Sequence, residues 1–319
     1  MSLDAESLVD RRRLKRRLTA WRIAAVTFAL VLIAAYLLSD KQAGPAGFLP
    51  HIARVTISGV ITDDLKMREL LEKIGKASQV KAVILRINSP GGTTTGGEAL
   101  YDAVRQLAEK KPVVAVCGTL ATSAAYIVAL ASDRIFVYGN TITGSVGAIF
   151  QWAEVTELLH TLGIKVEEVK SGPLKAAPSP FEPTDARARQ VTEDMVQDAK
   201  VWFVDLVGKR RSINPDSVPG LTEGRIYSGR QAVDLKLVDQ IGDEKAATTW
   251  LAKERNVPAG LRVVDWKPAE ESSSLLGWIA QSLAAAIGLS ADTISGISSE
   301  IAATLKLDGL VSVWHPASN

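Results

Sequence analysis

Cysteine and histidine are nearly absent from this sequence. Its 319 residues include one cysteine, Cys117, and three histidines, His51, His160 and His315. A single cysteine excludes a disulfide framework and a cysteine metal site within one chain, and no histidine stands in a recognisable catalytic motif. Nothing else indicates a metal ion or a nucleotide, so we expect no cofactor. A serine nucleophile in this protein would therefore need a base other than histidine.

A large excess of charge of either sign is also missing. The formal net charge is +2, and much of the positive charge lies in one block, Arg-Arg-Arg-Leu-Lys-Arg-Arg at residues 11–17. Without this block the chain is mildly acidic. This balance argues against nucleic acid as the main partner.

An apolar segment follows the basic block, and within residues 18–38 Arg22 is the only charged residue. At about 1.5 Å per residue, a helix of this length spans roughly 30 Å, which is enough to cross a bilayer. We therefore predict a basic cytoplasmic segment over 1–17 and a transmembrane anchor over 18–39, with the remainder outside the cytoplasm. A cleaved signal peptide is the alternative, but the sequence near residues 39–43 offers no convincing small-x-small cleavage site.

After a linker of Gly, Ala and Pro at residues 40–50, apolar strand patterns alternate with helical patterns. Such alternation predicts parallel strands covered by helices on both faces, which is an α/β core. We expect a catalytic domain over 51–255 and a C-terminal extension of uncertain structure over 256–319. The predicted strands cover 54–61, 81–87, 112–117, 134–137 and 165–169, and the predicted helices cover 65–76, 97–110, 123–130, 152–162 and 244–254.

Two further segments have a helical or apolar pattern. A long helix is predicted to follow a cap at Thr184, and its apolar stripe favours ordinary core packing. In the extension, residues 275–289 are apolar but too short to span a membrane comfortably. They could lie on the membrane surface, pack on another subunit or form a modestly ordered tail. The stripe of the long helix consists of Val191, Met195, Ala199, Trp202, Phe203 and Leu206.

A paired glycine ends the second predicted strand, in the sequence Asn-Ser-Pro-Gly-Gly at residues 88–92. Glycine lets bare backbone N–H groups approach a ligand closely, and adjacent N–H groups can stabilise the oxyanion of an acyl-transfer intermediate. By itself such a pair more often marks a turn.

Ser123 lies among small residues, in Ala-Thr-Ser-Ala-Ala-Tyr at 121–126, where a helix is predicted to begin. A nucleophile at this position would have the Ala124 N–H beside it as an oxyanion donor. The alternative is that Ser123 is a helix N-cap. The pattern alone does not identify an enzyme.

Lys175 lies in a proline-rich loop over 172–183 and is the candidate base. A lysine accepts a proton only when it is uncharged, which requires burial away from water, and its neighbours Leu174, Ala176 and Ala177 are apolar. Ser145, in Thr-Gly-Ser-Val-Gly, could fix the amine by a hydrogen bond. The alternative is an ordinary solvated surface lysine.

Taken in order, these motifs resemble the SppA-type signal peptide peptidases, in their short form with a single core copy. The likeness covers about residues 51–251 and is carried by residues 87–92, 121–126, 130–135, 143–147, 170–175 and 224–232. The resemblance implies a Clp protease and crotonase-like fold and a serine endopeptidase with a Ser/Lys dyad. It implies Ser123 as nucleophile, Lys175 as general base, Ser145 as the residue that coordinates the lysine, and Gly91 or Gly92 with Ala124 as the oxyanion hole.

The resemblance also implies a setting for the enzyme. The expected substrates are hydrophobic peptides, namely signal peptides left in the membrane after preprotein processing. The expected protein is a single-pass protein of the bacterial inner membrane with a periplasmic catalytic domain. It is expected to form a homo-oligomer in which neighbouring chains complete the dyad. The family often has Gly-Gly after the nucleophile, where this chain has Ala124 and Ala125, so small side chains are retained.

Three other functions are compatible with parts of the sequence. A related membrane Ser/Lys protease with a dedicated protein substrate would differ mainly in what it cuts. A crotonase-like acyl-CoA enzyme could use the glycine pair, but it gives no role to the anchor or to Lys175. A non-catalytic membrane scaffold would tolerate loss of Ser123 or Lys175, both of which are present.

Overall fold

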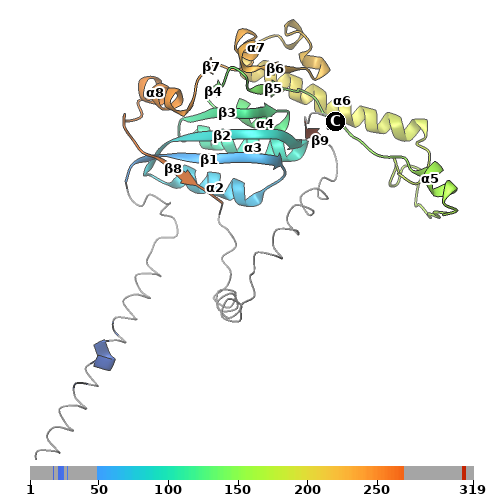
Figure 1. The fold of residues 1–319 in the computed structure, drawn as a ribbon, viewed down its shortest axis with the longest axis horizontal. Coiled ribbons are helices and arrows are strands. Elements are labelled where there is room, and N and C mark those ends of the chain that lie inside the picture. Colours follow the sequence, from blue (N-terminus) through green and yellow to red (C-terminus); the bar gives the residue numbers. More distant parts are fainter. Residues whose placement is uncertain (1–16, 18–20, 25–26, 28–48, 269–310, 314–319) are drawn as a thin grey trace, which may run out of the picture. The chain divides into compact units, whose positions relative to one another are not determined.

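A mostly parallel β-sheet forms the centre of the protein (Figure 1). The structure is a computed structural model that describes residues 17, 21–24, 27, 49–268 and 311–313. Along the main path the strand order is β6-β5-β3-β2-β1-β8, and only the pairs β5–β6 and β2–β9 are antiparallel. The strands are β1 (His51–Ile61), β2 (Val80–Thr93), β3 (Val113–Thr122), β4 (Arg134–Val137), β5 (Ile142–Gly144), β6 (Ile226–Ser228), β7 (Gln240–Ile241), β8 (Val263–Trp266) and β9 (Val311–Val313).

Helices lie on both faces of this sheet, as the alternating pattern predicts. Helices α2, α3 and α4 belong to the larger core, and α8 packs on the opposite face. The mixed α/β class is therefore confirmed. The helices are α2 (Leu65–Lys76), α3 (Thr94–Ala108), α4 (Ala124–Leu130), α5 (Thr156–Thr161), α6 (Ala186–Arg211), α7 (Gly229–Asp234) and α8 (Glu244–Glu254), with 3-10 turns at Pro215–Ser217 and Leu221–Glu223.

The central strands are apolar because both of their faces are covered. In β2, Val83 and Leu85 belong to the larger core, whereas Ile84 between them packs in the core beside α8. Side chains of a strand alternate between the two faces, so a strand buried on both sides reads as one continuous apolar run. These runs explain why the sequence predicts β2 and β3 well.

Helices α2, α6 and α8 each begin after an aspartate cap, whereas α3 is capped by Thr93. The Asp64 carboxylate accepts hydrogen bonds from the Lys66 and Met67 N–H groups at the start of α2. At α6 the cap is Asp185, which accepts from the Ala188 N–H at 2.7 Å. The predicted cap at Thr184 is therefore wrong by one residue. Thr184 instead accepts a hydrogen bond from the Trp152 indole at 3.0 Å.

Residues 148–185, which we call the arm, contain the two clearest errors of the sequence analysis. The predicted strand over 165–169 does not form, and Val169, which its pattern would bury, is fully exposed. The predicted helix over 152–162 shortens to α5, which buries none of its residues. A strand forms in a sheet only where a partner strand is available, and the arm projects away from the sheet (Figure 1).

The apolar stripe of α6 is buried only in its second half. Phe203 is 2% exposed, whereas Val191 and Met195 are 51% and 45% exposed. Figure 1 shows the reason, because the first half of α6 extends with the arm beyond the sheet. The prediction that the stripe packs in the core is thus confirmed only for the second half of the helix.

Part of the predicted domain organisation falls outside the described residues. This holds for the stretch 275–289 and for the anchor over 18–39 apart from residues 21–24 and 27. Within the described part of the chain, no helix combines the length and the apolar character that a membrane crossing needs. The sheet continues past residue 255, because β8 pairs with β1.

The single cysteine gives a test of this packing. Cys117 is 1% exposed, and burial raises the pKa of its thiol to about 12. Because only the thiolate reacts, we expect no alkylation by iodoacetamide in the folded protein at mildly alkaline pH, and complete alkylation in urea. Intact-mass measurement checks both states. Rapid alkylation without urea would contradict the position of β3 in the core.

Candidate active site

Ser123 occupies the single residue between β3 and α4. Its backbone has φ 58° and ψ −123°, a region that residues other than glycine rarely adopt. All residues of α4 are at most 1% exposed, so the surrounding core holds the chain in this conformation. The Ser123 side chain makes no capping hydrogen bond to α4. The alternative that Ser123 is a conventional N-cap is therefore not supported.

Two hydrogen bonds join this turn to the neighbouring segments. The Ser123 N–H donates to the Gly144 carbonyl at 2.9 Å, and the Thr122 hydroxyl donates to the Pro90 carbonyl at 3.0 Å. Ser145 directly follows Gly144, and the predicted oxyanion glycines directly follow Pro90. The fold thus places the segment of the glycine pair and the segment of Ser145 beside the Ser123 turn.

Ser145 is held by a second unusual turn. Its φ is 54°, and that of Gly144 is 89°. The Ser145 N–H donates to the Arg225 carbonyl at 2.9 Å. A Cβ on Gly144 would lie 2.7 Å from the Tyr227 ring. The motif at 224–232, whose role the sequence did not reveal, therefore supports the position of Ser145.

The two glycines of the pair have different surroundings. The Gly91 N–H donates to the Ser89 hydroxyl at 3.1 Å, and that hydroxyl donates to the Gly59 carbonyl at 2.6 Å. Gly92 must be glycine, because a Cβ there would lie 1.8 Å from the Ile61 carbonyl oxygen. Of the predicted oxyanion donors, the Gly91 N–H is therefore already engaged by Ser89, whereas the Ala124 N–H begins α4 and has no acceptor within the helix.

Ser89 lies beside the candidate site, and the sequence analysis assigned it no role. It is fully buried, and its hydroxyl links β2 to the Gly59 carbonyl in β1. The only signal in the sequence is its place directly before Pro90. A small hydroxyl residue at a strand end is too common to be assigned a role without its partners.

Lys175 lies apart from this cluster, on the arm. It is exposed, and its backbone N–H donates to the Gly172 carbonyl at 3.1 Å. Within the described residues its side chain forms no hydrogen bond or ion pair, so one chain does not bring it into bonding distance of Ser123 or Ser145. The predicted apolar burial of Lys175 is also absent from the single chain. The nearby Lys170 is engaged differently, in ion pairs with Glu168 and Glu182.

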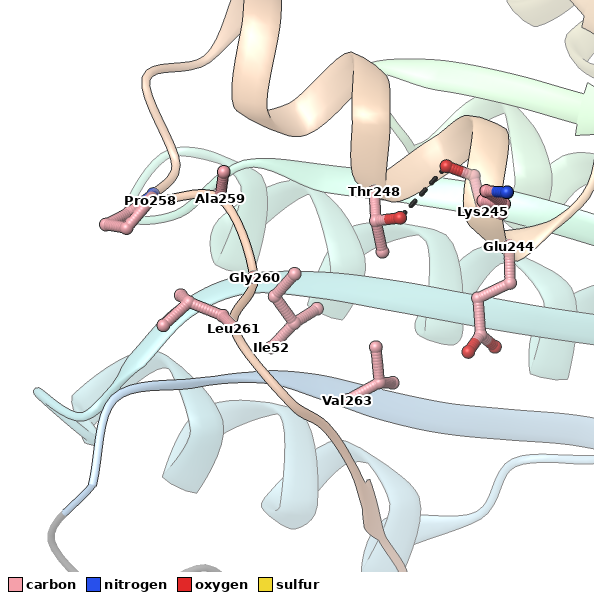
Figure 2. A pocket seen from close by; sticks show the side chains of 9 residues that line it. All are labelled: Ile52, Glu244, Lys245, Thr248, Pro258, Ala259, Gly260, Leu261 and Val263. Carbon is pink, nitrogen blue, oxygen red and sulfur yellow. Dashed lines mark hydrogen bonds between the residues drawn. The ribbon is translucent and has the colours of Figure 1, made fainter.

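A pocket of about 290 Å³ lies elsewhere, between α8 and the start of β1 (Figure 2). Its one carboxylate, from Glu244, is paired with Arg54 at 3.1 Å, and Lys245 is the other charged residue of its lining. Within the described part of the chain, no group of His, Cys, Asp and Glu is arranged to hold a metal ion. The lining residues are Ile52, Glu244, Lys245, Thr248, Pro258, Ala259, Gly260, Leu261 and Val263, and none of them is a predicted site residue.

Comparison with known families gives two matches. Residues 105–258 match peptidase family S49, and residues 52–146 match the Clp protease family. The first match contains Ser123, Ser145 and Lys175. The second contains the glycine pair and Ser123, and it identifies the α/β core as Clp protease-like.

Two individual relatives and one solved structure are also similar to this chain. A protein of Synechocystis sp. named as a protease is 32% identical over 203 residues, which are 63% of this chain and 73% of the relative. A protein of Enterococcus faecium, provisionally named a signal peptide peptidase SppA, is 32% identical over 259 residues, 76% of this chain and 74% of the relative. Among solved structures, a ClpP1 variant from Listeria monocytogenes matches with a TM-score of 0.40 and 18% identity, covering 60% of this chain and 91% of its own.

The turn at Gly144 can be tested by adding one methyl group. Gly144→Ala combines a φ of 89° with a Cβ 2.7 Å from the Tyr227 ring, whereas Gly163→Ala has a φ of 71° and open space. We expect the control to lower the free energy of unfolding by about 1 kcal/mol and Gly144→Ala to lower it by roughly 3 kcal/mol. Urea unfolding measures both. Equal losses would show that Tyr227 does not pack against this turn.

The hydroxyl of Thr122 can be removed without changing the shape of its side chain. Thr122→Val leaves the Pro90 carbonyl without its donor, and the turn at Ser123 should shift relative to Gly92. We expect the rate of Ser123 labelling by a fluorophosphonate probe to fall roughly tenfold, and Thr122→Ser to restore it. Labelling of a folded Thr122→Val protein at the parental rate would contradict this role.

Proposed function

This chain belongs to peptidase family S49 and is a serine peptidase. From that premise we propose that it is a membrane-anchored endopeptidase, which degrades signal peptides left in the membrane after preprotein processing. The observation that carries the proposal is the strained turn at Ser123. Ser123 is the nucleophile that the family resemblance implies. Its N–H donates to the carbonyl of Gly144, the residue before Ser145.

The proposed reaction is acyl transfer through a Ser/Lys dyad. The Ser123 hydroxyl attacks the scissile carbonyl carbon while an uncharged Lys175 amine takes the hydroxyl proton. The Gly92 and Ala124 N–H groups stabilise the oxyanion. The lysine then gives its proton to the leaving amine, and the same lysine activates the water molecule that hydrolyses the acyl-enzyme.

We propose that a neighbouring copy of the chain supplies the lysine. Two observations support this: the Lys175 side chain is exposed and unpaired in the described part of its own chain, and the arm that carries it is rich in exposed apolar residues. Leu158, Leu162 and Ile164 are 58%, 62% and 50% exposed, which is costly unless another surface covers them. Burial of the arm in an assembly would also supply the dry environment that an uncharged lysine needs.

The location of the enzyme rests on the sequence alone. The basic block at 11–17 followed by the apolar segment over 18–39 supports a single-pass anchor with the catalytic domain on the periplasmic side of the bacterial inner membrane. Membership of a peptidase family favours this function over an acyl-CoA enzyme or a non-catalytic scaffold. A dedicated protein substrate in place of signal peptides stays the alternative within the same chemistry.

Mixed assemblies test whether the dyad is shared. Ser123→Ala and Lys175→Ala should each abolish cleavage of a hydrophobic signal-derived peptide. If neighbouring chains complete the dyad, randomly mixed oligomers of the two variants should regain about a quarter of the parental rate, because each site needs one intact serine and one intact neighbouring lysine.

The control for this experiment is a mixture of each variant with itself, carried through the same dissociation and reassembly. No recovery in mixed oligomers that have demonstrably formed would show that the dyad lies within one chain. Cleavage by Lys175→Ala alone at the parental rate would remove Lys175 as the base.

A further inference from the structure

Two arginine side chains hold the end of α4 that lies away from the nucleophile turn. The backbone carbonyl groups of Leu130, Ala131 and Ser132 follow one another where this helix ends. The Arg210 guanidinium donates from Nε to the Leu130 carbonyl at 2.7 Å and from Nη2 to the Ser132 carbonyl at 3.0 Å. The Arg105 guanidinium donates to the Ala131 carbonyl between them at 2.9 Å. We call these two guanidinium groups, bound to three consecutive carbonyls, the arginine clamp.

The clamp connects α4 to two other helices. Arg105 comes from the last turn of α3, and Arg210 comes from the last turn of α6. On α6, Phe203 and Val207 precede Arg210 at spacings that place all three on one face of the helix. The Phe203 ring lies 6.4 Å from the Tyr126 ring of α4, and Val207 is fully buried. Helix α6 therefore contacts α4 both at its middle and at its end.

The clamp brings two positive charges together away from water. Burial lowers the pKa of the Arg210 guanidinium, and the charge of the nearby Arg105 lowers it further. Neither arginine forms an ion pair with a carboxylate in the part of the chain that the structure describes. The carbonyl groups and the partial negative charge at the end of α4 compensate for this arrangement, with a smaller contribution from the nearby Asp133.

The position of α4 also sets the position of the proposed nucleophile. The helix has seven residues, so its two ends are about 10 Å apart. Its first end is joined to the strained turn at Ser123, and such strain persists only where the surrounding structure prevents its relief. Sliding or tilting of α4 would relieve the turn. It would also move the Ser123 hydroxyl and the Ala124 N–H relative to a bound peptide carbonyl.

We propose that Arg210 is a positioning residue for catalysis, because its guanidinium, together with that of Arg105, fixes α4 from the end opposite Ser123. The catalytic part of this inference rests on the proposed function, in which Ser123 is the nucleophile, whereas the clamp on α4 does not. A displacement on the order of 1 Å near the reacting groups lowers a rate by up to about a hundredfold. Loss of the Arg210 guanidinium should therefore slow the acyl-transfer step.

The test compares Arg210→Ala with Lys209→Ala in the full-length protein. The control removes a positive charge from the same turn of α6, and Lys209 is exposed and forms no hydrogen bond or ion pair among the described residues. We expect Arg210→Ala to lower kcat for a hydrophobic peptide roughly tenfold with KM unchanged. The rate of Ser123 labelling by a fluorophosphonate probe should fall by the same factor. Lys209→Ala should match the parent in both measurements.

Hydrogen–deuterium exchange gives a readout that does not depend on catalysis. The Tyr126 and Ile127 N–H groups donate to the Ser123 carbonyl and close the first turn of α4. We expect these amides to exchange roughly tenfold faster in Arg210→Ala than in the parent, whereas the amides of Val83–Leu85 in β2 should change less. A residue that only stabilised the fold as a whole would accelerate both sets equally. Equal acceleration, or none in α4, would overturn the proposal.

A second variant covers the case in which Arg210→Ala does not fold. Arg210→Lys keeps the positive charge and most of the side-chain stem, but it lacks the planar fork that reaches two carbonyls at once. We expect its kcat and its exchange in α4 to lie between those of the parent and those of Arg210→Ala. Parental values of both in Arg210→Lys would contradict a role for the guanidinium.

The two kinds of readout separate this inference from the proposed function. If neither the parent nor any variant cleaves peptide or is labelled at Ser123, the proposed function fails, while exchange in α4 still decides whether Arg210 holds the helix. If the parent is active and a folded Arg210→Ala protein matches it in kcat and in labelling, Arg210 does not position the nucleophile.

Discussion

The conformation of one residue, Ser123, is the constraint on which the site depends. Strand β3 lies inside the sheet and α4 is buried along its whole length. Ser123 is the single residue between them, and the chain passes from strand to helix there at a φ of 58°. The Ser123 N–H continues the pairing of β3 with β5 by donating to the Gly144 carbonyl. Packing of the core therefore holds the Ser123 backbone in its strained conformation, and this conformation sets the orientation of Ser123.

The proposed chemistry is divided between a rigid part and an exposed part of the chain. Ser123, Ser145 and Gly92 are positioned by the Clp protease-like core, in which short hydrogen bonds from Thr122 and Ser89 fix neighbouring segments. Lys175 is carried by the arm, which buries little on its own. Such a division would make activity conditional on assembly.

The sequence predicts the core well and the arm poorly, for one physical reason. In the core, local pattern and tertiary burial agree: the apolar runs of β2 and β3 are buried on both faces, and α2 follows its predicted bounds. In the arm, the strand predicted over 165–169 has no partner strand and does not form. Likewise, Val191 and Met195 continue a helical stripe past the point where the sheet ends. Apolar periodicity predicts which side chains need cover, but not whether the same chain supplies it.

The sequence by itself determined the α/β class, the order of the motifs and the identity of Ser123, Ser145 and Lys175 as candidates. Residue type and spacing are sufficient for these, because they reflect chemistry and local pattern. Only the tertiary structure decided that Gly91 is already engaged by Ser89, that Tyr227 holds the turn before Ser145, and that Lys175 stands away from Ser123. Each of these depends on contacts between residues far apart in the chain, which the packing of the sheet and its helices creates.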